Sequence, residues 1–156
     1  MLGIIPVGIF LCVHFLLNSS VFLNGFSTYE ITIKGMKAVP LIVLAELIII
    51  AIPILFHGIY GIWIVYLAKN NALRFTYYRN WMFYLQRITA VITLIFVIIH
   101  VYTLRLMQHE PAMIINTLVS HLQNPLFFAL YIIGVLSAIF HFANGNMAER
   151  TPIIYN

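Results

Sequence analysis

Four long apolar runs, each interrupted by one histidine, constrain this chain more than any other feature of its sequence. The histidines are His14, His57, His100 and His141, at intervals of 43, 43 and 41 residues. Each interval matches one membrane-spanning helix plus one connection, because a span needs about 20 apolar residues. The runs predict an all-α, integral membrane four-helix bundle with one imidazole on each helix.

The composition supports a membrane protein and excludes several kinds of site. Only 8% of the residues are charged and 63% are hydrophobic, whereas a soluble domain carries about 25% charged residues. Cys12 is the only cysteine, which excludes an intramolecular disulfide, a thiolate-ligated iron–sulfur cluster and covalent CxxCH haem attachment. The net charge of +4 is interpreted as membrane topology, and no nucleic-acid partner is expected.

The apolar runs and the polar segments between them define the expected organisation. The bundle occupies residues 1–145, and residues 146–156 form a polar tail. A signal peptide is disfavoured for the first run because it lacks a basic leading region. The four spans are expected at residues 1–23, 41–68, 82–106 and 125–145.

The second connection fixes the expected orientation. Residues 69–79 include Lys69, Arg74 and Arg79 and no acidic residue, and basic connections stay in the cytoplasm. The helices then alternate, so that His14 and His100 lie toward the outside. His57 and His141 lie toward the cytoplasm.

A bis-imidazole haem needs two ligands at one depth on facing helices, and alternate helices are the diagonals of a simple bundle. The sequence therefore predicts two haems b, an outer one held by His14 and His100 and an inner one held by His57 and His141. An intramembrane histidine can instead join helices or carry protons, so a non-haem proton-coupled transporter remains an alternative. His109 and His121 are expected near the surface and not as ligands.

Further polar residues interrupt the apolar runs. Arg87 and Arg105 are candidates for binding haem propionates, because arginine can contact a carboxylate through two donors. Side chains expected to assist are Gln86, Thr89 and Tyr102. For Arg105, ordinary extension toward the membrane surface is the alternative.

Glu46 is an acidic residue in the outer half of the second span. A carboxylate at that depth is a candidate for proton exchange with a quinone. A hydrogen-bonded structural role is the alternative.

Four stretches of the sequence resemble a known family, the cytochrome b membrane-anchor subunit of succinate dehydrogenase and fumarate reductase. They are MLGIIPVGIFLCVHFLLNS, IPILFHGIYGI, YLQRITAVITLIFVIIHVYTLR and IFHFANG. The most similar form is the single-polypeptide, two-haem anchor of Bacillus-like bacteria that use menaquinone. Members also carry an N-terminal arm and a fifth helix, which we expect this chain to lack.

The resemblance implies a function and partners. It implies the same haem pairing and a location in the bacterial cytoplasmic membrane. A flavoprotein subunit would oxidise succinate, and an iron–sulfur subunit would pass electrons to this chain, both docked on the cytoplasmic face. The chain would relay the electrons to menaquinone without oxidising succinate itself. Another di-haem cytochrome b of a quinone oxidoreductase is the alternative, but such a subunit carries two ligands on each of two helices.

Overall fold

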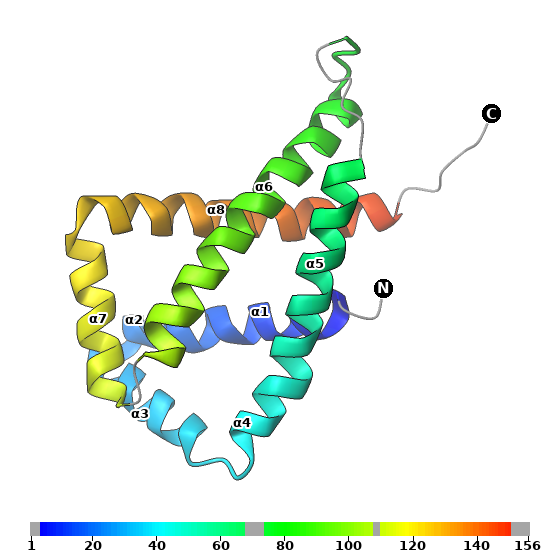
Figure 1. Ribbon diagram of the computed structural model, residues 1–156. Coiled ribbons are helices and arrows are strands. Elements are labelled where there is room, and N and C mark those ends of the chain that lie inside the picture. The colour runs from blue at the N-terminus through cyan, green and yellow to red at the C-terminus, as the bar shows by residue number, and fades with distance from the viewer. Residues whose placement is uncertain (1–3, 68–73, 108–109, 151–156) are drawn as a thin grey trace. The chain divides into compact units, whose positions relative to one another are not determined.

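The computed structural model describes residues 4–67, 74–107 and 110–150, and within these ranges every regular element is a helix (Figure 1). This confirms the all-α prediction. In the labels of Figure 1, η denotes a π-helical turn, in which the backbone hydrogen bonds span one residue more than in an α-helix. The elements are α1 (Ile4–Ser19), α2 (Val21–Asn24), α3 (Phe26–Lys37), α4 (Ile42–Ala45), η1 (Glu46–Ala51), α5 (Ile52–Leu67), α6 (Tyr78–Val101), η2 (Tyr102–Leu106), α7 (Pro111–Gln123) and α8 (Pro125–Arg150).

The chain divides into two compact units. The first comprises Met1–Tyr60 with Thr103–Ser120, and the second comprises Gly61–Tyr102 with His121–Asn156. In the first unit α1 packs against η1 and α3, and in the second α6 packs against α8. The α6–α8 pair is the most extensive helix packing within the described residues.

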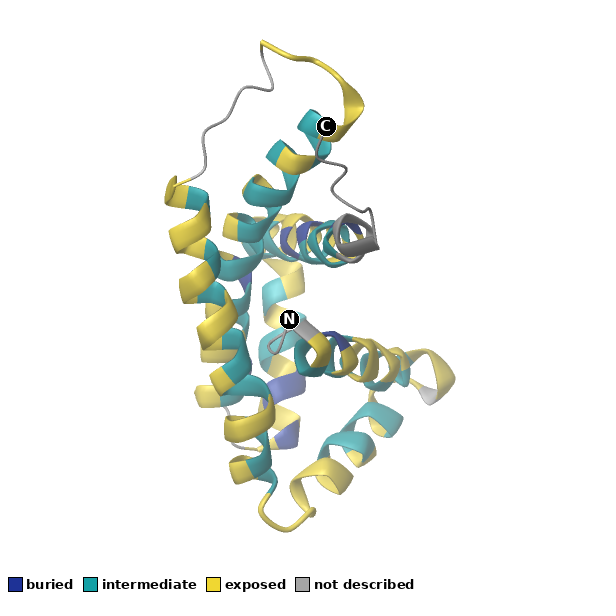
Figure 2. Cartoon of the chain, turned by 90° about the vertical axis from the view of Figure 1, so that its right-hand side faces the viewer, coloured by how far each residue is buried: buried dark blue, intermediate teal, exposed yellow. Residues whose placement is uncertain are grey.

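Within the described part of the chain, four helical segments are long and apolar enough to cross a membrane: Ile5–Leu23, Ile42–Leu67, Tyr78–Leu106 and Pro125–Gly145. They coincide with the four expected spans, and the chain is a multi-pass membrane protein. Most of their large apolar side chains are exposed, and exposed residues are coloured yellow on the cartoon of Figure 2. Such surfaces suit a lipid environment, where acyl chains are as apolar as the side chains themselves.

Two segments expected as polar connections are helical. Residues 26–37 form α3, which carries an ion pair one turn apart between Lys34 Nζ and Glu30 Oε1 at 2.7 Å. Gly25 separates α2 from α3 with a φ of 70°, a conformation that glycine adopts without strain. Residues 111–123 form α7, which buries Ile114 and Ile115.

The last helix is longer than its apolar pattern. α8 continues through Arg150, beyond the expected end of the fourth span at residue 145. The first five residues of the expected polar tail are therefore helical. Residues 151–156 lie outside the described part of the chain.

A π-helical turn accompanies the proline of the second span. Pro53 has no N–H, and in a regular α-helix its ring would collide with the carbonyl group four residues earlier, that of Ile49. The backbone from Glu46 to Ala51 forms η1, which ends two residues before this proline. The changed hydrogen-bond register there accommodates the proline within a continuous helical segment. The second span therefore contains a π turn that begins at Glu46.

Candidate functional site

The four intramembrane histidines are shared equally between the two units. His14 on α1 and His57 on α5 belong to the first unit, whereas His100 on α6 and His141 on α8 belong to the second. Each pair expected from depth takes one histidine from each unit. The pairing therefore stays a prediction, and each histidine is described within its own unit.

Within the second unit, α6 and α8 run antiparallel. The Gln86 side chain contacts the His141 backbone, whereas the His100 ring lies near Tyr131, with centroids 5.9 Å apart. Tyr131 precedes His141 by ten residues, which is roughly 15 Å along an α-helix. His100 and His141 therefore lie at different levels of this helix pair.

The ring of His141 has a defined hydrogen-bond partner. Its Nδ1 lies 3.1 Å from the backbone carbonyl oxygen of Gln86. A carbonyl oxygen only accepts, so Nδ1 must carry the proton in this contact. The neutral ring then keeps its lone pair on Nε2, which is the usual arrangement of a metal-binding histidine. The environment of His141 thus fits axial ligation of haem iron through Nε2.

Gln86 is oriented by polar contacts between α6 and α8. Its Nε2 donates to the His141 carbonyl oxygen at 3.0 Å. The Asn144 Nδ2 donates to Gln86 Oε1 at 2.8 Å and to the Met82 carbonyl oxygen at 3.1 Å. Gln86, which we expected near a haem propionate, thus joins two helices around His141. The hydroxyl of Thr89 donates within its own helix, to the Leu85 carbonyl oxygen at 2.8 Å.

His100 lies in an aromatic cluster at the other end of the α6–α8 contact. Its ring centroid is 5.5 Å from that of Phe96, and Tyr131 meets it edge-on at 68°. Tyr131 also contacts His121, whose ring stacks on Phe127 with centroids 4.1 Å apart. Burial lowers the pKa of His121 below its ordinary value, because a low-polarity environment disfavours the imidazolium.

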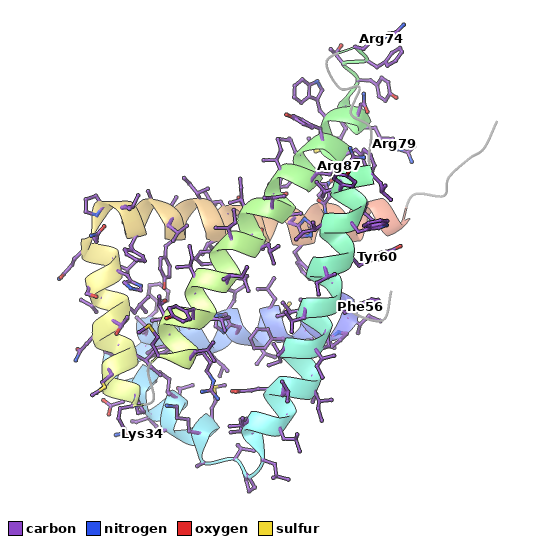
Figure 3. The ribbon with its side chains drawn as sticks, viewed as in Figure 1. Lys34, Phe56, Tyr60, Arg74, Arg79 and Arg87 are labelled. Atoms are coloured by element: carbon purple, nitrogen blue, oxygen red, sulfur yellow. The ribbon has the colours of Figure 1, made fainter. Side chains whose placement is uncertain are left out.

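His14 and His57 belong to the first unit, and His14 is half-buried. The His14 ring lies 5.3 Å from that of Phe10, and its backbone carbonyl oxygen accepts a hydrogen bond from Asn18. His57 is exposed on α5. The rings of Phe56 and Tyr60 beside it stack in parallel, with centroids 6.1 Å apart (Figure 3). His109 lies outside the described residues.

Glu46 and Arg105 form an ion pair within the first unit. Arg105 donates to Glu46 Oε2 through Nε at 3.0 Å and through Nη2 at 2.5 Å. Each residue lies on a π-helical turn, Glu46 on η1 and Arg105 on η2. We expected a quinone site for Glu46 and a propionate contact for Arg105, without a link between them. The signal was present in the sequence, since Glu46 lies near the start of the second span and Arg105 near the end of the third. Consecutive spans alternate in direction, so these two ends are expected at the same side.

The remaining candidates lie on α6 and η2. The guanidinium of Arg87 lies over the Phe83 ring, 4.0 Å from its centroid, in a cation–π contact. Figure 3 places Arg87 on the same N-terminal part of α6 as Arg79. Tyr102 is exposed on η2.

Comparisons with known proteins agree with this architecture. A family model described as "Succinate dehydrogenase/Fumarate reductase transmembrane subunit" matches residues 66–146. The succinate dehydrogenase cytochrome b558 subunit of Bacillus subtilis (strain 168) is 41% identical over 146 residues, which cover 93% of this chain and 72% of that protein. No solved structure matches the chain.

Proposed function

The chain belongs to the succinate dehydrogenase/fumarate reductase transmembrane subunit family, and on that premise we propose that it is the membrane anchor and electron-transfer subunit of a succinate:menaquinone oxidoreductase. An iron–sulfur subunit on the cytoplasmic face supplies electrons, which pass through two bis-histidine haems b to the quinone. The flavoprotein subunit, not this chain, oxidises succinate.

The observation that carries the proposal is the hydrogen bond between His141 Nδ1 and the Gln86 carbonyl oxygen. In the neutral ring it places the lone pair on Nε2, the atom that would ligate a metal. The position of His100 at the other end of the α6–α8 contact supports a second haem at another depth. We assign His57 and His141 to the inner haem and His14 and His100 to the outer haem.

The protein residues determine what this site can do. Haem bound here would supply a reversible one-electron carrier, and ligation by two of these histidines would leave the iron no open position. The histidines therefore favour electron transfer over binding of a small molecule at iron. Arg87 is a candidate for a propionate of the inner haem. Glu46, which forms an ion pair with Arg105, is the candidate for proton exchange with a quinone near the outer haem.

Two haems at two depths also give the membrane potential a role. Moving one elementary charge through the full potential corresponds to about 2.3 kcal/mol per 100 mV. With the basic loop 69–79 in the cytoplasm, haem held by His57 and His141 would lie nearer the electron source, and haem held by His14 and His100 would lie nearer the outer face. The potential then favours the movement of electrons toward a low-potential quinone.

The test is to replace each histidine by leucine in the complex co-expressed with its soluble partners. Haem per chain and the reduced-minus-oxidised spectrum are measured in purified complexes. We expect His14→Leu and His100→Leu to lose the same haem, and His57→Leu and His141→Leu to lose the other. His121→Leu is the matched control and retains both.

Two outcomes would count against the proposal. Loss of the same haem from His14→Leu and His57→Leu would contradict the pairing. A wild-type complex without b-type bands would contradict haem binding altogether and favour the proton-coupled transporter.

A further inference from the structure

Gln86 and His141 are joined by two hydrogen bonds that run in opposite directions. The His141 ring donates to the backbone carbonyl oxygen of Gln86, and the Gln86 side chain donates to the backbone carbonyl oxygen of His141. Each residue thus holds the other through one side-chain and one main-chain atom. The ring of His141 therefore depends on α6 for its position as well as on α8, which carries it.

Asn144 determines the orientation of the Gln86 amide. The Met82 carbonyl oxygen can only accept, so the Asn144 group facing it must be the NH2. The second hydrogen of that NH2 points to Gln86 Oε1. The Gln86 Nε2 is then left for the His141 carbonyl oxygen, which also only accepts. The orientations of the Asn144 and Gln86 amides are therefore set by two backbone carbonyl groups, that of Met82 at one end of the hydrogen-bonded series and that of His141 at the other.

The space around this cluster is limited. Asn144 is buried, with 9% of its surface exposed. A Cβ atom built at Gly145 would lie 3.3 Å from Gln86 Nε2, so the glycine leaves room for the amide. The cluster formed by Gln86, His141 and Asn144 is thus packed as well as hydrogen-bonded.

We propose that Gln86 and Asn144 are positioning residues for the inner haem, because they set the orientation and the electron donation of the His141 ring. This inference rests on the proposed function of His141 as an axial ligand. A carbonyl that accepts the Nδ1 proton increases the donation of Nε2 to a metal. Stronger donation favours ferric over ferrous haem and lowers the midpoint potential. Loosening the cluster should therefore raise the potential of the inner haem.

Two substitutions on different helices test the inference in the complete complex. Gln86→Met and Asn144→Leu keep the approximate size of each side chain and remove its amide. We expect both to shift the midpoint potential of the inner haem to more positive values. A tenfold loss of preference for the ferric state corresponds to about 59 mV. The low-spin EPR signal of that haem, which depends on the angle between its two imidazole planes, should change with the potential.

The outer haem and a neighbouring hydroxyl provide the controls. The outer haem should keep its potential in both variants. Thr93→Val is the matched control on α6, because within the described residues the Thr93 hydroxyl has no hydrogen-bond partner, and it should leave both haems unchanged. Loss of the inner haem alone from either variant would also support the inference.

Unchanged potential and EPR signal of the inner haem in both variants would overturn the inference, as would an equal shift of both haems. If one variant fails to assemble, the other, on the opposite helix, decides the question. The His141→Leu variant distinguishes failure of this inference from failure of the proposed function. If that variant keeps both haems, the ligand assignment is wrong whatever the amides do.

Discussion

At the scale of single residues, the ion pair of Glu46 and Arg105 links two charges that would each be costly alone in an apolar segment. The side chains are 30% and 41% exposed in the isolated chain, and both lie within apolar helical segments. An uncompensated charge there is unfavourable, whereas the pair presents no net charge. The contact also connects η1 to η2.

Replacing one partner of this ion pair should lower the stability of the protein more than replacing both partners. Glu46→Gln leaves the Arg105 guanidinium without its carboxylate and should lower the free energy of unfolding. Arg105→Gln should do the same, and the double variant should recover part of the loss. We expect a coupling of about 0.5–3 kcal/mol between the two positions. Thermal unfolding of the four proteins in one detergent measures it, and additive effects would show that the ion pair contributes no stability.

The ligand histidines and their hydrogen-bond partners differ in how far the sequence predicts them. The regular spacing of four histidines in apolar runs is visible without a structure. The contact of Gln86 with His141 is not, because its partners are 55 positions apart and depend on the rotation of two helices. Glu46 and Arg105 were both identified, but their pairing depends on the same unknown rotations.

At the scale of elements, the α6–α8 contact depends on a small residue opposite a large one. A Cβ atom at Gly134 would lie 2.7 Å from Phe96 Cβ and would overlap its ring. Phe96 is itself buried, at 8% exposure. Small residues allow helices to approach closely in membranes, and Gly134 has this role.

Gly134→Ala should therefore force α6 and α8 apart. We expect it to lower the free energy of unfolding by about 1–3 kcal/mol, the usual cost of adding volume to a packed site. Gly61→Ala on α5 is the matched control, since nothing lies within 4 Å of a Cβ atom there. That control should be neutral or slightly stabilising, because alanine is the better helix former by about 1 kcal/mol. Equal stability of both variants in a chemical unfolding series would contradict the close contact.

The long helices were predictable, whereas the short ones were not. Apolar runs of more than 18 residues leave few alternatives to spanning helices. In contrast, α3 contains Gly35 and buries none of its residues. A helix that packs no apolar face against the protein has no need of a periodic apolar pattern, and so its sequence does not reveal it. The π turns escaped prediction because the apolar pattern continues through them.

At the scale of the whole molecule, the proposed electron path needs residues from both compact units. His14 and His57 come from one unit, and His100 and His141 come from the other. Sequence spacing and loop charge supply the depth of each histidine, which is enough to propose the pairs. They do not supply the rotation of each helix about its axis, which decides whether two imidazoles at one depth face each other.

The orientation of the chain in the membrane determines which haem lies nearer the proposed partner subunits. It can be tested in the absence of those subunits. Cys12 is the only cysteine, so Cys12→Ser gives a cysteine-free background for single reporter cysteines. A membrane-impermeant maleimide should label Asn70→Cys in inverted vesicles and not in intact cells, because basic connections are retained in the cytoplasm. Gln108→Cys, in the following connection, should show the opposite pattern as the control. Labelling of Asn70→Cys from outside would show that the helices run in the opposite directions. His57 and His141 would then lie in the outer layer, and the iron–sulfur subunit would dock nearest to His14 and His100.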